Sequence, residues 1–533
     1  MTRPNAQVVF SSCCALLFAG AAYAQGGRGA GDWGTAGNDA QRSGWVRTDA
    51  KISPESMAKP GFAFLWKQKV ASDAKQLNSL TEAVLMERYI GYRGFRSLAH
   101  LGASGDKVFA FDTDLGRVEW TKAIGTPAAQ PGTAACPGGL TTSLARPIGF
   151  AISPPASGRA GGGFGRGGPA KSGVGEPGEG AVTLAQIAAQ AQQGGGRGPG
   201  ALPGRGQPQA LRPAGGQQRM PGYVYALSSD GKLHAMYLSN GEEPNPAVPF
   251  VPANANAVGL TVADGVAYVA TINGCGGAPN GVWALDLNSK QVTSWKASGS
   301  IAGNAGFAFG PDGTIYAGTE SGELVGLEPK SLKVLATYSA GAPGFASTPA
   351  VFEFHDKPMV AIAAKDGSVH VLPSTLGSAV AKSPAASSSG DVQAGALTTW
   401  QDGDGTRWLL APAAGSIVAW KLADANGTVT LTRGWASRDM VAPLPPMVMN
   451  GVVFAVSSGE FRTKDAMTAA QRAQKSQKAV LYALDGKSGK ELWNSGNTIT
   501  SFVHSGGLSG AGSQLYLQTY DGTLYAFGFP IEH

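Results

Sequence analysis

Residues 482–493, which read YALDGKSGKELW, are the clearest copy of a repeat that runs along this 533-residue chain. The copy joins an alternating apolar strand to an aspartate-initiated turn that ends in a glycine, and a tryptophan follows. Residues 109–120 and 283–295 carry the same order of residue types, and looser copies begin near residues 225, 325, 370, 418 and 525. The turn needs glycine because glycine reaches positive φ without strain, and we expect the tryptophan to pack across to the next repeat. The residues of the repeat to which we assign a structural role are Asp112, Trp120, Asp286, Trp295, Asp485, Gly489 and Trp493.

The spacing of the copies predicts the architecture. Copies that start at residues 283, 325, 370, 418, 482 and 525 are 42 to 64 residues apart. Repeats of roughly 40–50 residues made of short strands are typical of propeller blades. We therefore predict an all-β chain folded as an eight-bladed β-propeller, with seven blades as the alternative. Residues 62–70 alternate like a strand that has no partner of its own. We expect them to join residues 514–520 and 523–527 in one blade, which would close the ring.

The first residues resemble an export signal. An apolar run over residues 8–22 follows Arg3 and ends at Ala22-Tyr23-Ala24, a pattern typical of a secretory signal peptide. We expect residues 1–24 to be removed, and we expect the mature protein to be periplasmic or secreted. The alternative, a lipoprotein modified at Cys13 or Cys14, would leave most of the apolar run in the mature chain. No later run is long enough to predict a transmembrane segment. Residues 25–57 are expected to form an N-terminal extension ahead of a propeller over residues 58–533.

Two cysteines, Cys136 and Cys275, remain of the four in the chain once the signal is removed. In an oxidising compartment such a pair predicts one disulfide, which would stabilise the fold by roughly 4 kcal/mol in the chain-entropy model. Two free thiols are the alternative. No C-x-x-C-H haem motif and no zinc-ligand spacing occurs, so we predict no metal ligands from the sequence.

Residues 154–221 differ in composition from the rest of the chain. They hold 20 glycines in 68 positions, and their seven basic and two acidic residues give a local charge of +5. With +1 from Arg3, this charge accounts for the formal net charge of +6, so the remaining chain is neutral and we predict no nucleic-acid binding. We interpret this insert as a disordered loop, and attraction to an anionic envelope polymer is the alternative. A second insertion, residues 463–478, is expected to be helical.

The repeat resembles that of the pyrroloquinoline quinone (PQQ) family of propellers. Residues 483–493 match its pattern A-x-D-x-x-[ST]-G-[KR]-x-x-W, and the stretches around Asp32-Trp33, Gln41-Arg42 and Gly44-Trp45 resemble the opening segment of secreted PQQ-like proteins. The sequences CPGG at 136–139 and GCGG at 274–277 are also similar to that group. The resemblance implies the fold more than an activity, because the family includes both quinoprotein dehydrogenases and non-catalytic scaffolds similar to BamB.

In the dehydrogenases the resemblance implies PQQ and Ca²⁺ on the propeller axis, with an acidic base and a disulfide between adjacent cysteines. The adjacent pair in this chain lies in the signal, and residues 339–351 lack the family's H-D-x-W-D motif. Glu320 stands where the G-D-N base motif would lie, and it could substitute as a carboxylate. Lys365 stands where the family places a cation near the quinone oxygens, which would stabilise the negative charge of the reduced quinone. The alternative is a turn lysine that faces solvent.

Three further polar residues are candidates. Arg438 could contact a cofactor carboxylate and Asp439 could act as an acid, or the two could belong to a structural ion pair between blades. His504 could act as an acid or base near neutral pH, or it could be a hydrogen-bonded core histidine.

From these observations we predict an exported propeller that acts as a non-catalytic binding or assembly scaffold for a protein or an envelope polymer. The alternative is a PQQ-dependent dehydrogenase that oxidises an alcohol or a sugar. A second alternative is a polysaccharide-binding propeller.

Overall fold

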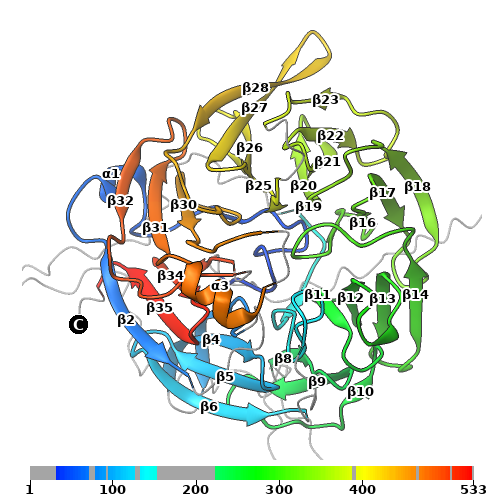
Figure 1. Ribbon diagram of the computed structural model, residues 1–533, viewed down its shortest axis with the longest axis vertical. Helices are drawn as coiled ribbons and strands as arrows, with labels where there is room; N and C mark the ends of the chain where they lie inside the picture. Colours follow the sequence, from blue (N-terminus) through cyan, green and yellow to red (C-terminus); the bar gives the residue numbers. More distant parts are fainter. Residues whose placement is uncertain are drawn as a thin grey trace, which may run out of the picture. The chain divides into compact units, whose positions relative to one another are not determined.

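The computed structural model describes residues 32–70, 79–91, 94–125, 132–152, 222–386, 392–463, 467–504 and 507–530, all of which belong to one compact unit. Within this unit, sheets of consecutive strands are arranged side by side around a central axis (Figure 1). The chain is an all-β, eight-bladed propeller, which confirms the predicted fold and removes the seven-bladed alternative. The predicted signal peptide and the predicted insert at residues 154–221 lie outside the described residues.

Each blade is a short antiparallel sheet. The first blade consists of β3 (Val84–Gly91), β4 (Gly94–Ala103), β5 (Lys107–Asp112) and β6 (Arg117–Ala123), and the second of β8 (Tyr223–Leu227), β9 (Lys232–Tyr237) and β10 (Val248–Pro249). The third consists of β11 (Asn256–Ala263), β12 (Val266–Ile272), β13 (Gly281–Asp286) and β14 (Val292–Lys296), with β7 (Pro147–Ile148) beside β11. The fourth consists of β15 (Phe307–Phe309), β16 (Ile315–Gly318), β17 (Glu323–Leu327) and β18 (Val334–Ser339).

The second four blades follow in ring order. The fifth blade consists of β20 (Ala350–Phe354), β21 (Lys357–Ala363), β22 (Val369–Pro373) and β23 (Ala381–Lys382), and the sixth of β25 (Thr398–Gln401), β26 (Arg407–Pro412), β27 (Ile417–Ala425) and β28 (Thr428–Ala436). The seventh consists of β29 (Met447–Met449), β30 (Val452–Ser457), β31 (Val480–Asp485) and β32 (Glu491–Asn494). The eighth consists of β33 (Ser509–Ala511), β34 (Gln514–Gln518), β35 (Thr523–Gly528) and β2 (Ala63–Lys69). A two-stranded pair, β19 (Ser347–Thr348) with β24 (Gly395–Ala396), lies outside the blades.

The ring is closed by the two ends of the propeller sequence. Strand β2 pairs antiparallel with β35, from Ala63 opposite Gly528 to Lys69 opposite Thr523. The two strands lie side by side in Figure 1, where β2 is blue and β35 is red. This pairing confirms that the N-terminal strand completes the last blade, so that the sheet edges at the junction are covered.

Burial along the strands follows their position in the blade. The middle strands β30 and β34 are buried at every residue because both of their faces pack against neighbouring blades. The outer strands β6 and β18 instead mix exposed and half-buried residues. The apolar middle strands therefore supply the core, and the outer strands are amphipathic.

A tryptophan contacts the turn of the next blade at three of the blade junctions. Trp435 in β28 packs against Gly489 in the turn of the next blade, and its Nε1 donates to the carbonyl of Gly486 at 3.0 Å. A Cβ added at Gly489, whose φ is +71°, would lie 2.5 Å from this indole. The same arrangement recurs from Trp66 to Thr113 and Gly116, and from Trp120 to Leu238 and Gly241. The indole therefore requires a residue without a side chain in the facing turn.

The aspartates of the repeat hold the turns, and the remaining tryptophans pack in the core. Asp112, Asp286 and Asp485 each accept main-chain N–H groups two or three residues further on. Such contacts stabilise turns, which agrees with the structural role assigned to the repeat. Trp493 lies edge-on to Phe62 with 4.9 Å between ring centroids, and Trp295 packs against the core of the third and fourth blades.

The sequence predicts an N-terminal extension ahead of the propeller. The structure differs, because residues 33–49 run through the interior of the ring. They contact the blades in ring order, and each contact is a hydrogen bond to an innermost strand or to the chain beside it. The pairs are Trp33 with Leu85, Gly34 with Arg146, Thr35 with Leu260, Ala40 with Phe309, Gln41 with Val351, Ser43 with Thr399, Gly44 with Val448 and Asp49 with Ser513. Residues Trp45–Val46 form β1, which pairs parallel with β29. The innermost strands leave polar main-chain groups unpaired towards the axis, and this segment satisfies them.

Arg42 is the centre of this axial segment. The residue is 1% exposed, and its side chain makes five hydrogen bonds that span two blades and the segment itself. The acceptors are the carbonyls of Phe307, Ala36 and Gly259 and the hydroxyls of Thr35 and Thr261, at 2.6 to 2.9 Å. Burial lowers the pKa of Arg42 to about 10, against the raising effect of Glu82 and Asp39, so the guanidinium is charged at neutral pH.

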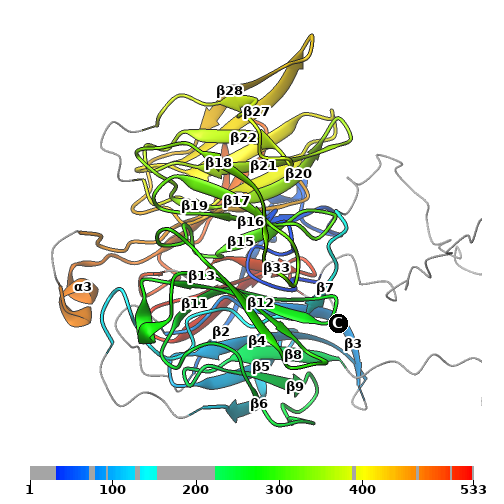
Figure 2. The same ribbon diagram turned by 90° about the vertical axis from the view of Figure 1, so that its right-hand side faces the viewer.

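The described helices are short. They are α1 (Pro54–Met57), the 3₁₀ turn η1 (Cys275–Gly277) and α3 (Ala469–Lys475). Helix α3 lies within the insertion predicted to be helical and projects from one face of the ring (Figure 2). Among the residues placed in the structure, no helix is long and apolar enough to cross a membrane.

Candidate functional site

A cavity of about 600 Å³ lies on the propeller axis, and its wall is formed by residues of seven blades together with the chain that leads into the second blade. The axial segment supplies its floor through Trp33, Ala36, Gly37, Arg42 and Gly44. Loops between the second and third strands of four blades supply Asn273, Glu320, Lys365 and Arg462. The volume lies within the range of small-ligand sites.

Glu320 and Lys365, two residues singled out from the sequence, meet in this wall. Lys365 Nζ lies 3.1 Å from Glu320 Oε2, and the side chains are 32% and 49% exposed. They come from equivalent loops of adjacent blades. The turn that carries Lys365 therefore borders the cavity and is not remote from it. The charge of Lys365 is already neutralised by the carboxylate of Glu320. The pair marks the part of the cavity that reaches solvent.

Arg438 and Asp439 do not lie on the axis. Arg438 belongs to the connection between β28 and β29 and donates to Glu491 at 2.7 Å, and its guanidinium stacks over the ring of Tyr482. Both residues are exposed, and neither lines the cavity. Their position is therefore that of a surface ion pair, in which Arg438 pairs with Glu491 rather than with Asp439. The structure gives no support to a contact of either residue with an axial cofactor.

Glu82, at the floor of the cavity, was not found by the sequence analysis. Its Oε1 accepts the Nε1–H of Trp33 at 2.8 Å and the N–H of Gly37 at 3.2 Å. Burial raises the pKa of Glu82 to about 7, although these hydrogen bonds and the charge of Arg42 act in the opposite direction. A carboxyl with a raised pKa in a cavity is a common feature of functional sites. No motif surrounds Glu82, because its partners lie on the axial segment.

His504 is part of a charged cluster at the wall between the seventh and eighth blades. Its Nδ1 lies 2.6 Å from Oε1 of Glu460, and Arg462 Nε donates to Oε2 of Glu460 at 3.0 Å. Burial opposes ionisation of Glu460, but the hydrogen bond and charge of His504, together with Arg462, lower its pKa below the usual value. His504 and Arg462 both line the cavity. His504 is thus neither alone nor a core histidine, since it faces the axial cavity.

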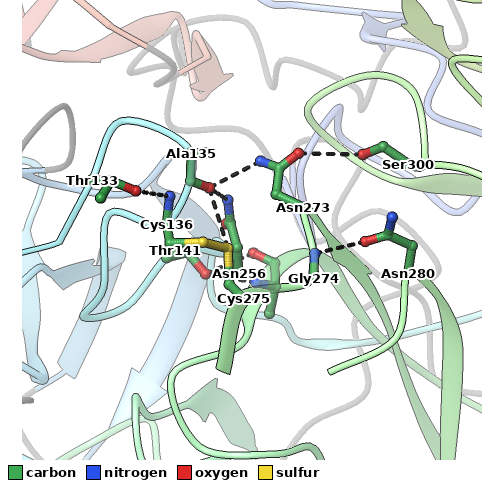
Figure 3. The surroundings of a disulfide bond; sticks show 11 residues. Thr133, Ala135, Cys136, Thr141, Asn256, Asn273, Gly274, Cys275, Asn280 and Ser300 are labelled. Carbon is green, nitrogen blue, oxygen red and sulfur yellow. Dashed lines mark hydrogen bonds between the residues drawn. A yellow bond between two sulfur atoms is a disulfide. The ribbon is translucent and has the colours of Figure 1, made fainter. Parts of the chain in front are cut away.

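The Cys136–Cys275 disulfide is present and supports one side of the cavity. It joins the chain before the second blade to the loop after β12, with 5.5 Å between the two Cα atoms. The carbonyl of Ala135 accepts the side-chain amides of Asn256 and Asn273, each at 2.9 Å (Figure 3). Both asparagines line the cavity. The disulfide therefore fixes two amide groups of the wall.

The donor set of the cavity does not fit the calcium–PQQ pair that the resemblance implies. Calcium takes about six to eight oxygen ligands, several of them carboxylates. Glu82 already accepts two N–H groups through one oxygen, and Glu320 is paired with Lys365. In the part of the chain that the structure covers, no three His, Cys, Asp or Glu residues are grouped so that they could hold a metal ion.

Comparison with known proteins supports the fold. No family model matches the chain, and no curated protein matches its sequence. The quinohemoprotein alcohol dehydrogenase from Comamonas testosteroni is similar in structure, with 12% identity and a TM-score of 0.52 over 94% of this chain and 81% of that one. The computationally designed Ika8 protein has 11% identity and a TM-score of 0.50 over 87% and 100%. BamB from Moraxella catarrhalis has 13% identity and a TM-score of 0.46 over 89% and 99%. At these identities the similarity concerns the propeller fold alone.

Proposed function

We propose that this protein is an exported, non-catalytic binding or assembly propeller whose axial cavity holds a segment of a partner protein or envelope polymer. The observation that carries the proposal is the cavity of about 600 Å³, which is lined by residues of seven blades and by the chain that leads into the second, and whose floor is the axial segment. A floor built from the chain's own residues gives the cavity a fixed depth. The ligand therefore enters from the face at which Glu320 is exposed.

The chemistry of the wall supports binding. Leu80, Ile272 and Pro445 are half-buried and offer apolar surface, and Asn304 and Gln393 add amide groups to the same wall. Apolar surface with a few fixed hydrogen-bonding groups is typical of ligand sites. This mixture suits the end or a loop of a peptide or polymer chain. The paired state of Glu320 and Lys365 favours a recognition role over a redox role.

Export is proposed on two grounds. Residues 1–24 carry the pattern of a signal peptide. The Cys136–Cys275 disulfide is of the kind that persists in oxidising compartments.

A variant that fills the cavity tests the proposal. Ala346 is half-buried in the wall, so Ala346→Trp would occupy part of the space. Val334→Trp is the matched control, because Val334 is 43% exposed on the outer strand β18. Tagged mature proteins would be incubated with cell-envelope extract, and the species retained would be identified by mass spectrometry. We expect a species that the wild type and Val334→Trp retain and that Ala346→Trp loses. Equal retention by all three proteins would contradict binding in the cavity.

A PQQ-dependent dehydrogenase is the second candidate, because Lys365 lines the cavity wall as the resemblance implies for a cation near the quinone, although its charge is paired with Glu320. Calorimetric titration of the mature protein with PQQ, with and without Ca²⁺, separates the two functions. Quinone binding coupled to oxidation of an alcohol or a sugar would replace the proposal. The absence of heat in both titrations would leave the binding function in place.

A further inference from the structure

We propose that His504 and Arg462 form a binding site for an oxyanion in the wall of the axial cavity. The ligand of the cavity therefore carries a carboxylate or phosphate group. This inference deepens the proposed function and rests on it, because it assigns the chemical class of what the cavity binds.

Glu460 holds the two side chains in place. It is 2% exposed and lies just after β30, at the base of the loop that carries Arg462. Each of its oxygens has one partner, Nδ1 of His504 at 2.6 Å and Nε of Arg462 at 3.0 Å. His504 belongs to the connection between β32 and β33, so the carboxylate joins two blades. Because both oxygens are engaged, the orientations of the imidazole and the guanidinium are fixed.

The nitrogen atoms of His504 and Arg462 that do not contact Glu460 face the cavity. His504 and Arg462 are 27% and 28% exposed, and both line the cavity wall. Among the described residues, Nε2 of His504 and the two Nη atoms of Arg462 have no hydrogen-bond partner. The Nη groups of arginine donate in a plane that matches the oxygens of a carboxylate or phosphate. An imidazolium whose Nδ1 is engaged donates its remaining N–H from Nε2.

The charge of the cluster also favours an anion. One buried carboxylate faces two side chains that can be cationic, so the cluster carries an excess positive charge when His504 is protonated. A purely structural role for Glu460 would need only one cation to neutralise it. The ammonium group of Lys365, which also lines the wall, is already paired with Glu320. An oxyanion of the ligand is therefore stabilised most strongly next to His504 and Arg462, where it can accept hydrogen bonds from both side chains.

Saturation-transfer NMR on the mature chain provides the test. Acetate and its neutral analogue acetamide are the carboxylate probes, and line broadening of inorganic phosphate in phosphorus spectra is the phosphate probe. Arg462→Gln and His504→Asn each remove one donor, and Arg462→Lys keeps the charge without the planar fork. Arg438→Gln is the matched control, because it removes a guanidinium that pairs with Glu491 outside the cavity. Thermal unfolding followed by circular dichroism checks that each variant is folded.

We expect acetate or phosphate to bind the wild type and Arg438→Gln equally, and acetamide to bind neither. Arg462→Gln and His504→Asn should weaken binding about tenfold, the effect of losing one charge-assisted hydrogen bond. Stronger binding of acetate would assign a carboxylate ligand, and stronger binding of phosphate would assign a phosphate ligand. Equal binding by all variants, or equal signals from acetate and acetamide, would overturn the site. If Arg462→Gln still retains the envelope species that Ala346→Trp loses, the oxyanion site fails while the binding function stands.

Discussion

Replacement of Arg42 by methionine tests the role of the axial segment directly. Methionine fills similar space in the core but cannot donate hydrogen bonds. The variant removes five bonds, whose acceptors include the carbonyls of Ala36, Phe307 and Gly259. The carbonyl of Gly259 keeps a second donor, the hydroxyl of Thr261. The carbonyl of Ala36 loses the donor that lies 2.6 Å away in the wild type. Buried acceptors left without a donor destabilise the folded state.

The expected magnitude follows from two opposing contributions. Hydrogen bonds from a charged donor contribute roughly 1.5 kcal/mol each at the lower end, so five of them contribute about 7 kcal/mol. Burial of the charge acts in the other direction, because it lowers the pKa of Arg42 from 12.5 to about 10. That shift corresponds to about 3 kcal/mol, which methionine does not incur. We therefore expect Arg42→Met to lower the free energy of unfolding by about 4 kcal/mol, in line with the loss of a buried charged partner.

Urea unfolding followed by tryptophan fluorescence measures this difference through the shift in midpoint. The control is Arg438→Met, which removes an arginine from an exposed ion pair and should leave the midpoint nearly unchanged. Arg42→Lys should fall between the wild type and Arg42→Met, because one ammonium group cannot reach acceptors on two blades. A loss below about 1 kcal/mol for Arg42→Met would refute the argument, since it would mean that the axial segment does not hold the ring together.

Three further predictions concern the blades, the disulfide and the cavity floor. Gly489→Ala should lower the free energy of unfolding by about 2–3 kcal/mol in the same urea assay, because the added Cβ would meet an indole. The control Gly427→Ala, which has φ of +83° but open space around it, should lower it by about 1 kcal/mol. Equal losses in the two variants would contradict the packing argument. Serine at both Cys136 and Cys275 should lower the free energy of unfolding by up to about 4 kcal/mol, and a reductant should then have no further effect on the midpoint. Because burial raises the pKa of Glu82 from 4.5 to about 7, the folded state retains a proton that the unfolded chain releases, so stability should fall as the pH rises from about 4.5 to 7. Glu82→Gln should flatten that fall in urea midpoints taken at the two ends of the range, and an unchanged slope would argue against the raised pKa.

The blades were predictable from the sequence because their determinants are local. The strand, the aspartate turn and the tryptophan recur within one repeat, so the spacing predicts eight blades, and the structure removes the seven-bladed alternative. The unpartnered alternation at residues 62–70 also predicted β2, since a propeller needs its two ends to pair. Glu320 and Lys365 are 45 residues apart, about one repeat, and each lies two residues before a glycine in its turn. The repeat therefore contains the information that puts them in equivalent loops of adjacent blades.

The axial segment was not predictable in the same way. Residues 33–49 have no strand periodicity, because successive residues bond to different blades rather than to one partner strand. Their resemblance to the opening of secreted PQQ-like proteins identified Gln41 and Arg42 as part of a motif but gave no location for them. Glu460 and His504 are 44 residues apart, but one follows a middle strand and the other joins two blades, so the repeat does not relate them. Only the closed ring brings them together.

Ring closure and the binding site both depend on the N-terminal part of the propeller sequence. The first part of the propeller sequence supplies both the strand that pairs with β35 and the floor of the cavity, so neither forms until the end of the chain is available. A ligand that needs the complete cavity binds the closed ring and not the unfolded chain, and it must therefore stabilise the fold in proportion to its concentration. This linkage separates two kinds of variant. Arg42→Met should lower stability whether ligand is present or not, whereas Arg462→Gln, in the wall, should mainly reduce the extra stability that acetate or phosphate confers. If both variants reduced only the ligand-dependent stability, the floor would be part of the binding surface and not a fastener of the ring.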